Sequence, residues 1–189
     1  HSGKRVNMLL KPAPADTGII FVRTDLGGEE IAAIAFNTAA TSYATTLRQN
    51  GAAVQTVEHL LGALAGLGIS NLFIALDAEE VPIMDGSAAP FVRMIADAGI
   101  QVQDRVQTVL KVTKPLFVRD RNKQLAIWPT ETPSISYFID FDHPLLREQS
   151  LTYQFSEENF IRDISAARTF GFLSDVQMLQ ANGLAKGGS

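Results

Sequence analysis

The sequence of 189 residues has no cysteine and only three histidines, His1, His59 and His143. The lack of cysteine excludes disulfide bonds and thiolate zinc sites, so a metal ion would need histidine and carboxylate ligands. A helical zinc pair of the form His-x-x-x-His is also missing, because the residue four positions after His59 is Ala63. Any metal site that uses His59 therefore needs ligands from distant segments.

Long runs of positive charge and of apolar residues are missing as well. The net charge is −4 and no Lys and Arg cluster exceeds RDRNK at 119–123, so we expect no nucleic-acid partner. No segment approaches the roughly 18 apolar residues of a membrane span, and residues 1–18 lack the apolar segment of a signal peptide. We therefore expect a soluble protein. The chain begins without Met and stops at the Gly-rich LAKGGS, so we expect truncation at both ends.

Composition and apolar patterning predict an α+β fold in two domains, 1–104 and 105–189. Hydrophobic residues make up 46% and charged residues 19% of the chain, as in ordinary globular proteins. In the first domain we expect strands at 4–12, 18–25, 31–36 and 71–77 and helices at 56–68 and 87–99. In the second domain we expect strands at 108–120, 123–129, 134–141 and 151–155 and helices that begin at Ser156 and near Ser174.

Two of these elements carry predictions about burial. The helix at 87–99 has Ser87 as its cap, Pro90 in the first turn and Gly99 as its terminator. We expect its core-facing stripe to consist of Phe91, Met94, Ile95 and Ala98. The strand at 134–141 should be half-buried, with one face formed by Ile135, Tyr137, Ile139 and Phe141.

The helix TVEHLLGALAGLG at 56–68 carries two adjacent ionisable residues, Glu58 and His59. Its apolar stripe consists of Val57, Leu60, Leu61 and Leu64. On the opposite side, His59 lies with the small residues Gly62, Ala63 and Gly66. These residues would let another backbone approach closely. We therefore expect a buried helix without a solvated face, in which both ionisable groups need partners.

Two interpretations of Glu58 and His59 stay open at this point. In the structural one, Glu58 follows a Thr56 cap and complements the positive helix N-terminus, while His59 is a hydrogen-bonded core residue. In the functional one, the same field favours Glu58 as an anion and His59 as a neutral imidazole. Those are the forms that a general base and a metal ligand require.

Three other segments could belong to a site. Asp85 in MDGSA suits a turn that enters a helix or, alternatively, a metal ligand. Asp142 and His143 in DFDHP precede a proline at a strand end, which suits a turn or a binding role. The segment ARTFGF at 167–172 suits an interhelix corner or a pocket wall. The chain has no Gly-x-Ser-x-Gly elbow, Walker loop or dinucleotide fingerprint.

Four segments in order carry a resemblance to a known family: TVEHLLGALAGLGISNL, PIMDGSAAPFV, IDFDHP and ARTFGF. They are similar to the bacterial UDP-3-O-acyl-N-acetylglucosamine deacetylase, a zinc amidase of lipid A biosynthesis, and the opening HSGKRV resembles that family's N-terminal region. The resemblance covers nearly the whole chain. It implies two domains of similar topology, each a helix layer packed on a β-sheet, with the active site between them and the second domain incomplete in this chain.

The resemblance implies roles for individual residues. Glu58 matches the general base, which takes a proton from zinc-bound water, and His59 matches the first zinc ligand. Thr169 matches the hydroxyl that stabilises the oxyanion of the tetrahedral intermediate. His1 matches a histidine near the metal that is not an essential ligand. The implied substrate-binding residues are Phe141, near the nucleotide, and Phe170 and Phe172, in the wall beside the oxyanion site.

The family's other catalytic groups are expected beyond Ser189. They are two zinc ligands on a His-Lys-x-x-Asp helix and a histidine that acts as general acid, so this chain holds one Zn²⁺ ligand of three. The resemblance implies a cytoplasmic, monomeric enzyme of Gram-negative bacteria that hydrolyses the N-acetyl group of an acylated UDP-sugar and releases acetate. We expect this chain to be inactive alone.

Two alternatives to this enzyme have different consequences. A non-catalytic module could use the interdomain groove to bind a nucleotide sugar or an acyl chain, and Glu58→Ala would then leave function intact. In the deacetylase, the same substitution should cause a large loss of turnover with little change in substrate affinity. A different zinc hydrolase with acetylated sugar substrates would also use Glu58 and His59, but it would not share the flanking motifs.

Overall fold

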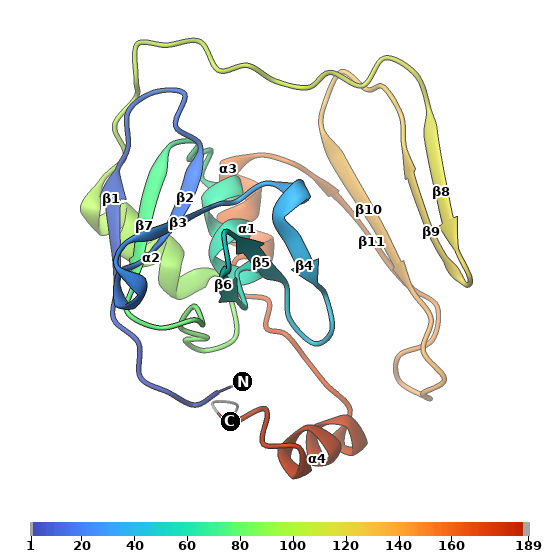
Figure 1. The fold of residues 1–189 in the computed structure, drawn as a ribbon. Helices are drawn as coiled ribbons and strands as arrows, with labels where there is room; N and C mark the ends of the chain where they lie inside the picture. The colour runs from blue at the N-terminus through green and yellow to red at the C-terminus, as the bar shows by residue number, and fades with distance from the viewer. Residues whose placement is uncertain (1, 187–189) are drawn as a thin grey trace.

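A computed structural model describes residues 2–186 and confirms the α+β class (Figure 1). A four-stranded sheet has the order β1-β7-β2-β3, where β1 is Met8–Pro12, β2 is Ile19–Arg23, β3 is Glu29–Ala32 and β7 is Leu72–Leu76. Strand β7 runs antiparallel to β1 and parallel to β2, and β3 runs antiparallel to β2. The four strands fall inside the segments expected from the sequence, except that β3 begins two residues early.

A second sheet of three short antiparallel strands was not expected from the sequence. It consists of β4 (Thr38–Ala40), β5 (Thr46–Gln49) and β6 (Ala52–Gln55). The predicted strand at 31–36 is wrong beyond Ala32, because Ala35–Asn37 forms a 3₁₀ turn before this sheet. Another 3₁₀ turn, Thr24–Leu26, follows β2.

Two helices cover the core of the N-terminal half, α1 (Glu58–Gly66) and α2 (Ala89–Ala98). The cap of α2 is Ala88 and not the predicted Ser87, whose hydroxyl instead accepts a hydrogen bond from the backbone N–H of Ala89 at 3.2 Å. The predicted stripe of α2 is right only in part, because Met94 is 41% exposed and Ala98 is also exposed. The buried face of α2 is formed by Pro90, Phe91, Val92 and Ile95.

Nearly the whole hydrophobic core comes from the N-terminal half of the chain. Its largest fully buried side chains belong to the four-stranded sheet, to β6, to the helices and to the segments beside them; they are Phe21, Ile31, Val54, Val57, Leu60, Leu64, Ile74, Leu76, Val81 and Phe91. Phe160 joins this core from the second half of the chain. No helix within residues 2–186 has the length and apolar character needed to cross a bilayer.

Residues 99–115 form an extended connection, and two hairpins follow it (Figure 1). The first pairs β8 (Leu116–Asp120) with β9 (Lys123–Ile127), and the second pairs β10 (Ser134–Ile139) with β11 (Gln149–Gln154). The strand expected from residue 108 therefore begins only at Leu116.

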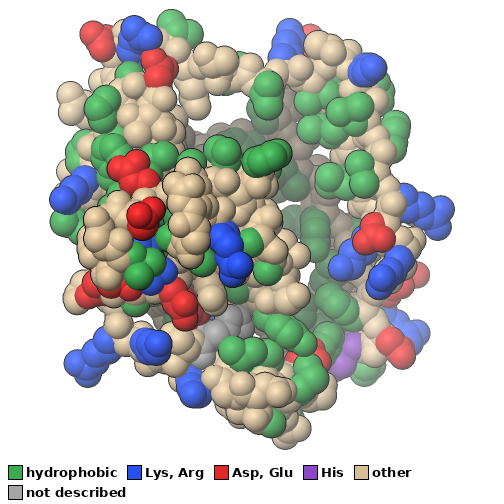
Figure 2. Space-filling view, viewed as in Figure 1, with side chains coloured by type: hydrophobic (Ala, Val, Ile, Leu, Met, Phe, Trp, Pro, Cys, Tyr) green, Lys and Arg blue, Asp and Glu red, His purple; other side chains and the backbone are tan. Residues whose placement is uncertain are grey.

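The two hairpins leave apolar side chains on both faces in contact with solvent. Tyr137 is 68% exposed on one face of β10 and Phe138 is 63% exposed on the other, so the expectation of a half-buried strand is wrong for this chain. Figure 2 shows hydrophobic side chains along the hairpins on the right of the molecule. A hairpin of two strands has no second layer against which to bury a face, which is the physical reason for this exposure.

The C-terminal part begins with a continuous helical segment, α3 (Glu157–Asn159) followed by a π-helical turn at Phe160–Ile164. Ser156 caps it as predicted, since its Oγ accepts a hydrogen bond from the backbone N–H of Asn159 at 3.1 Å. Helix α4 (Leu173–Ala181) ends just before the predicted Asn-Gly terminator. The domain boundary at residue 104 and the shared topology of the two halves stay predictions.

Candidate active site

Glu58 and His59 begin helix α1, as the sequence predicted, but the cap is different. The residue before the helix is Val57, which makes no side-chain hydrogen bond to the first turn. The predicted Thr56 cap is wrong, because its hydroxyl donates to Oε1 of Glu80 at 3.0 Å. Glu58 in the first turn therefore complements the positive end of the helix dipole without a neighbouring cap.

Glu58 lies in contact with solvent, so the prediction that α1 has no solvated face is wrong. Glu58 and Ala65 are both exposed. Oε2 of Glu58 accepts a hydrogen bond from the backbone N–H of Thr45 at 3.0 Å, in the loop that leads into β5. This bond restrains the carboxylate on one oxygen, and water reaches the side chain. An exposed and restrained carboxylate is suited to take a proton from a water molecule.

His59 is half-buried on the face of α1 that the sequence predicted to meet another part of the chain. Gly66, seven residues later, lies on nearly the same face because seven residues are close to two helical turns. A Cβ at Gly66 would overlap the ring of Phe160. The small-residue face of α1 therefore receives an aromatic side chain, and not a backbone, from the C-terminal part.

The residues near His59 do not complete a metal site. Within residues 2–186, no group of three or more His, Cys, Asp and Glu side chains is placed to hold a metal ion. His143 lies beside Phe172, with ring centroids 5.5 Å apart, and its Nδ1 accepts from the backbone N–H of Leu145 at 3.2 Å. His1 lies outside the described residues. One imidazole does not fit zinc by itself, since protein zinc sites take three or four side-chain ligands.

Thr169 lies against the loop MDGS, which brings two of the singled-out segments together. Its backbone N–H donates to the carbonyl of Gly86 at 2.9 Å. In this loop, Oδ1 of Asp85 accepts from both the N–H and the hydroxyl of Ser87, at 3.0 and 2.7 Å. The Ser87 hydrogen bond lowers the pKa of Asp85, burial opposes this, and the charge of Arg168 adds to it. Asp85 thus makes the turn-type contacts that the structural interpretation expected.

The three phenylalanines expected to bind substrate form one aromatic cluster. Phe141 contacts Phe170 and Phe172 edge to face, with centroid separations of 5.8 and 5.4 Å, and Phe170 contacts Phe172 at 6.1 Å. Phe170 is 61% exposed, while Phe141 and Phe172 are half-buried. Phe170 directly follows Thr169 in the chain, so the cluster presents an apolar wall beside this residue.

The expected catalytic residues form two groups in the structure. Among the interactions of the described residues, no hydrogen bond or ring contact joins Glu58 or His59 with residues 141–172. Phe160 packs against Gly66, at the far end of α1 from Glu58 and His59, and belongs to neither group. The relation of the two groups as parts of one site therefore stays a prediction.

Glu80 is a residue that sequence reasoning missed. Its side chain is buried, with 9% exposure, and its carboxylate accepts hydrogen bonds from Thr56 and from the backbone N–H of Ser2. Burial alone would raise the pKa of Glu80, but hydrogen bonds, those from Ser2 and Thr56 among them, lower it well below its usual range. The only sequence signal was the position of this glutamate directly before an apolar Val81-Pro82 pair.

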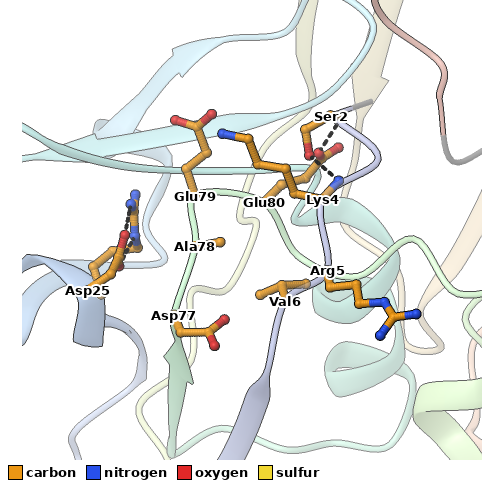
Figure 3. Close-up of a pocket in the computed structure, with 10 residues that line it drawn as sticks. Ser2, Lys4, Arg5, Val6, Asp25, Asp77, Ala78, Glu79 and Glu80 are labelled. Carbon is orange, nitrogen blue, oxygen red and sulfur yellow. Dashed lines mark hydrogen bonds and ion pairs between the residues drawn. The ribbon is translucent and has the colours of Figure 1, made fainter.

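Glu80 also borders an open cavity of about 360 Å³ (Figure 3). The lining comes from 2–6, 23–25 and 77–80 and carries charges of both signs. None of Glu58, His59 and Thr169 lines this cavity. We therefore assign it no part in the candidate site.

Comparison with known proteins agrees with the motifs. The family model described as UDP-3-O-acyl N-acetylglycosamine deacetylase matches residues 1–189. The chain is similar to proteins named UDP-3-O-acyl-N-acetylglucosamine deacetylase from Myxococcus xanthus, at 50% identity over 190 residues, and from Saccharophagus degradans, at 48% over 192 residues. A protein of the same name from Syntrophus aciditrophicus is 47% identical over 190 residues.

These alignments include the whole chain but only part of each relative. They cover 100% of this chain and 60%, 63% and 60% of the Myxococcus, Saccharophagus and Syntrophus proteins. The chain thus spans about three fifths of the length of the relatives it matches. Since the family model matches every residue of the chain, this protein belongs to the UDP-3-O-acyl N-acetylglycosamine deacetylase family.

Proposed function

We propose that this chain forms part of a zinc-dependent deacetylase that hydrolyses the N-acetyl group of UDP-3-O-acyl-N-acetylglucosamine in lipid A biosynthesis. The observation that carries the proposal is the family match over all 189 residues. Relatives that bear this enzyme's name are 47% to 50% identical to the chain over its full length. The substrate is an acylated UDP-sugar, acetate is the second product, and the enzyme acts as a monomer in the cytoplasm.

Glu58 is the general base of the proposed reaction. Its carboxylate is exposed at the start of α1, and the Thr45 N–H restrains Oε2. A base must lie within hydrogen-bond reach of the water that it deprotonates, and this requires a carboxylate that is both accessible and held in place. The position of Glu58 meets both requirements.

His59 is one zinc ligand in this proposal. The described residues do not complete a set of three ligands around it. The proposal for His59 therefore depends on ligands from outside the described residues, and we propose that the 189-residue chain is inactive alone. Measurement of the zinc content tests this proposal. We expect tight stoichiometric zinc in a chain of the relatives' full length and not in the 189-residue chain.

Thr169 and the aromatic cluster form the proposed substrate side of the site. The hydrogen bond from Thr169 N–H to Gly86 positions the residue, and its side chain is exposed, so the hydroxyl is available to an oxyanion. Phe141, Phe170 and Phe172 provide an apolar surface beside it. A hydroxyl next to an aromatic wall suits a substrate that combines polar sugar groups with an acyl chain.

Substitution of Glu58 in a full-length deacetylase that carries this sequence tests the proposal. Glu58→Gln keeps the size of the side chain but removes the base, so kcat should fall by about 10² to 10⁴ while KM changes only slightly. Glu30→Gln is the matched control, since Glu30 is an exposed glutamate on β3 and should tolerate the change. Full activity of the Glu58→Gln enzyme would overturn the role of Glu58 as the base, whereas absence of deacetylase activity in the full-length protein with Glu58 intact would support a non-catalytic binding module.

A further inference from the structure

Thr56, two residues before Glu58, has a backbone conformation that is costly for its residue type. Its φ is 57°, in the left-handed region, where a β-branched side chain is a genuine outlier. Its side chain is also buried, with 3% exposure. Such a conformation is energetically unfavourable and persists only where the surroundings impose it. The surroundings of Thr56 must therefore hold it in place.

The side chain of Glu80 provides this hold. Its Oε1 accepts the hydrogen bond from the Thr56 hydroxyl at 3.0 Å, and its Oε2 accepts from the backbone N–H of Ser2 at 2.8 Å. Figure 3 shows Ser2 and Glu80 side by side at the cavity. One buried carboxylate therefore joins the N-terminal segment to the residue that leads into α1.

The backbone around Glu80 holds the other side of the same turn. Gln55 N–H donates to the carbonyl of Glu79 at 2.8 Å, and Val81 N–H donates to the carbonyl of Gln55 at 3.0 Å. Gln55 and Glu80 thus form a parallel bridge directly before Thr56. The chain enters α1 from a turn that residues 79–81 restrain through both backbone and side chain.

We propose that Glu80 is a positioning residue for Glu58, because its hydrogen bond to Thr56 maintains the strained turn from which α1 begins. This inference rests on the proposed function, in which Glu58 is the base. A change of conformation at Thr56 would rotate the first turn of α1 and move the Glu58 carboxylate away from Thr45. Small displacements of a catalytic group, on the order of 1 Å, can cost about 10²-fold in rate.

Thr56→Val and Thr56→Ser separate the hydrogen bond from the packing. Valine keeps the shape of threonine but loses the hydroxyl, which leaves Oε1 of Glu80 without this donor. Serine keeps the hydroxyl. In a full-length deacetylase that carries this sequence, Thr56→Val should lower kcat by about tenfold or more with KM changed less than about threefold. Thr56→Ser should retain kcat to within about threefold.

Glu80→Ala and Asp77→Ala form a second matched pair. Both carboxylates accept hydrogen bonds from the N-terminal segment, since Asp77 accepts from the backbone N–H and from Nδ2 of Asn7 at 2.7 and 2.6 Å. Only Glu80 also contacts Thr56. We expect Glu80→Ala to lower kcat as Thr56→Val does, whereas Asp77→Ala should retain it. All rates are measured well below each variant's thermal midpoint, so that the unfolded fraction does not contribute.

The outcomes distinguish this inference from the proposed function. If Thr56→Val and Glu80→Ala retain kcat while Glu58→Gln loses it, the positioning role is overturned and the deacetylase proposal stands. If Glu58→Gln also retains kcat, Glu58 is not the base and the premise of this inference fails. If the unsubstituted full-length protein has no deacetylase activity, the proposed function itself fails. Equal losses in Thr56→Ser and Thr56→Val would likewise overturn the role of the hydroxyl. Loss in Thr56→Val with rescue in Thr56→Ser supports it.

Discussion

The substitution Gly66→Ala tests the contact through which α1 meets the C-terminal part of the chain. Gly66 is the last residue of α1 and is buried, and a Cβ at this position would overlap with Cγ, Cδ1 and Cε1 of Phe160. Phe160 is only 6% exposed and belongs to the main core. The substitution therefore forces the ring of Phe160 away from the helix.

The expected change in stability is the balance of two effects. Alanine favours a helix over glycine by up to about 1 kcal/mol, and less at a helix end. Overpacking a core costs about 1–3 kcal/mol, and a displaced Phe160 ring also loses part of the roughly 3 kcal/mol that burial of such a side chain contributes. The second effect is larger because the overlap is with three ring atoms of a buried residue. We expect Gly66→Ala to destabilise the chain by about 1–2 kcal/mol.

Urea denaturation of the 189-residue chain, followed by circular dichroism, measures this change. Gly62→Ala is the matched control, since Gly62 lies one turn earlier and an added Cβ there has no neighbour within 4 Å. It should stabilise the chain by up to about 1 kcal/mol. In a Phe160→Ala background the Gly66→Ala penalty should disappear, which a double-mutant cycle detects. Stabilisation by Gly66→Ala would refute the expected overlap with Phe160. The same destabilisation by Gly66→Ala in the Phe160→Ala background would refute it as well.

Two further substitutions test local features. Gly51→Ala should destabilise the β5–β6 hairpin by about 1–2 kcal/mol in urea denaturation. Gly51 has a φ of 84° and open space around it, so only its backbone conformation opposes a side chain. An unchanged stability would contradict this prediction. The hydrogen bonds from Arg23 to both oxygens of Asp25, at 2.9 and 2.7 Å, lower the pKa of Asp25 against the opposing effect of burial. Because the pKa of Asp25 is lower in the folded chain than in the unfolded chain, its carboxylate stabilises the fold at pH values above the unfolded pKa of about 3.9. This stabilisation is lost as the pH falls below that value. Asp25→Asn should therefore flatten the loss of unfolding free energy below about pH 4, and parallel pH curves for the two proteins would exclude the effect.

Local sequence patterns were sufficient to place helices and strands where many neighbouring residues share the same pattern. Helix α1, helix α4 and strand β7 lie where the sequence places them, and Ser156 caps its helix as predicted. Strands β5 and β6 were missed because four residues show little periodicity. The Asn50-Gly51 pair between them, with φ values of 51° and 84°, is a hairpin signal that could have revealed them.

Burial was the property that local patterns predicted least well. Met94 continues the apolar stripe of α2 but is 41% exposed, and Tyr137 on β10 is 68% exposed. An alternating or helical pattern shows which residues share a face, but it does not show whether another layer covers that face. Among the described residues β10 pairs only with β11, so most of both its faces is left without a covering layer.

The sequence by itself determined the family resemblance, the α+β class and the pair Glu58 and His59 at the start of a helix. Tertiary structure alone decided that Glu58 is exposed, that Phe141 lies against Phe170 and Phe172, and that Glu80 holds Thr56. Thr56 and Glu80 are 24 positions apart in the chain. Periodicity relates residues within a few turns or one strand, whereas contacts of this kind arise only when the folded chain brings distant segments together.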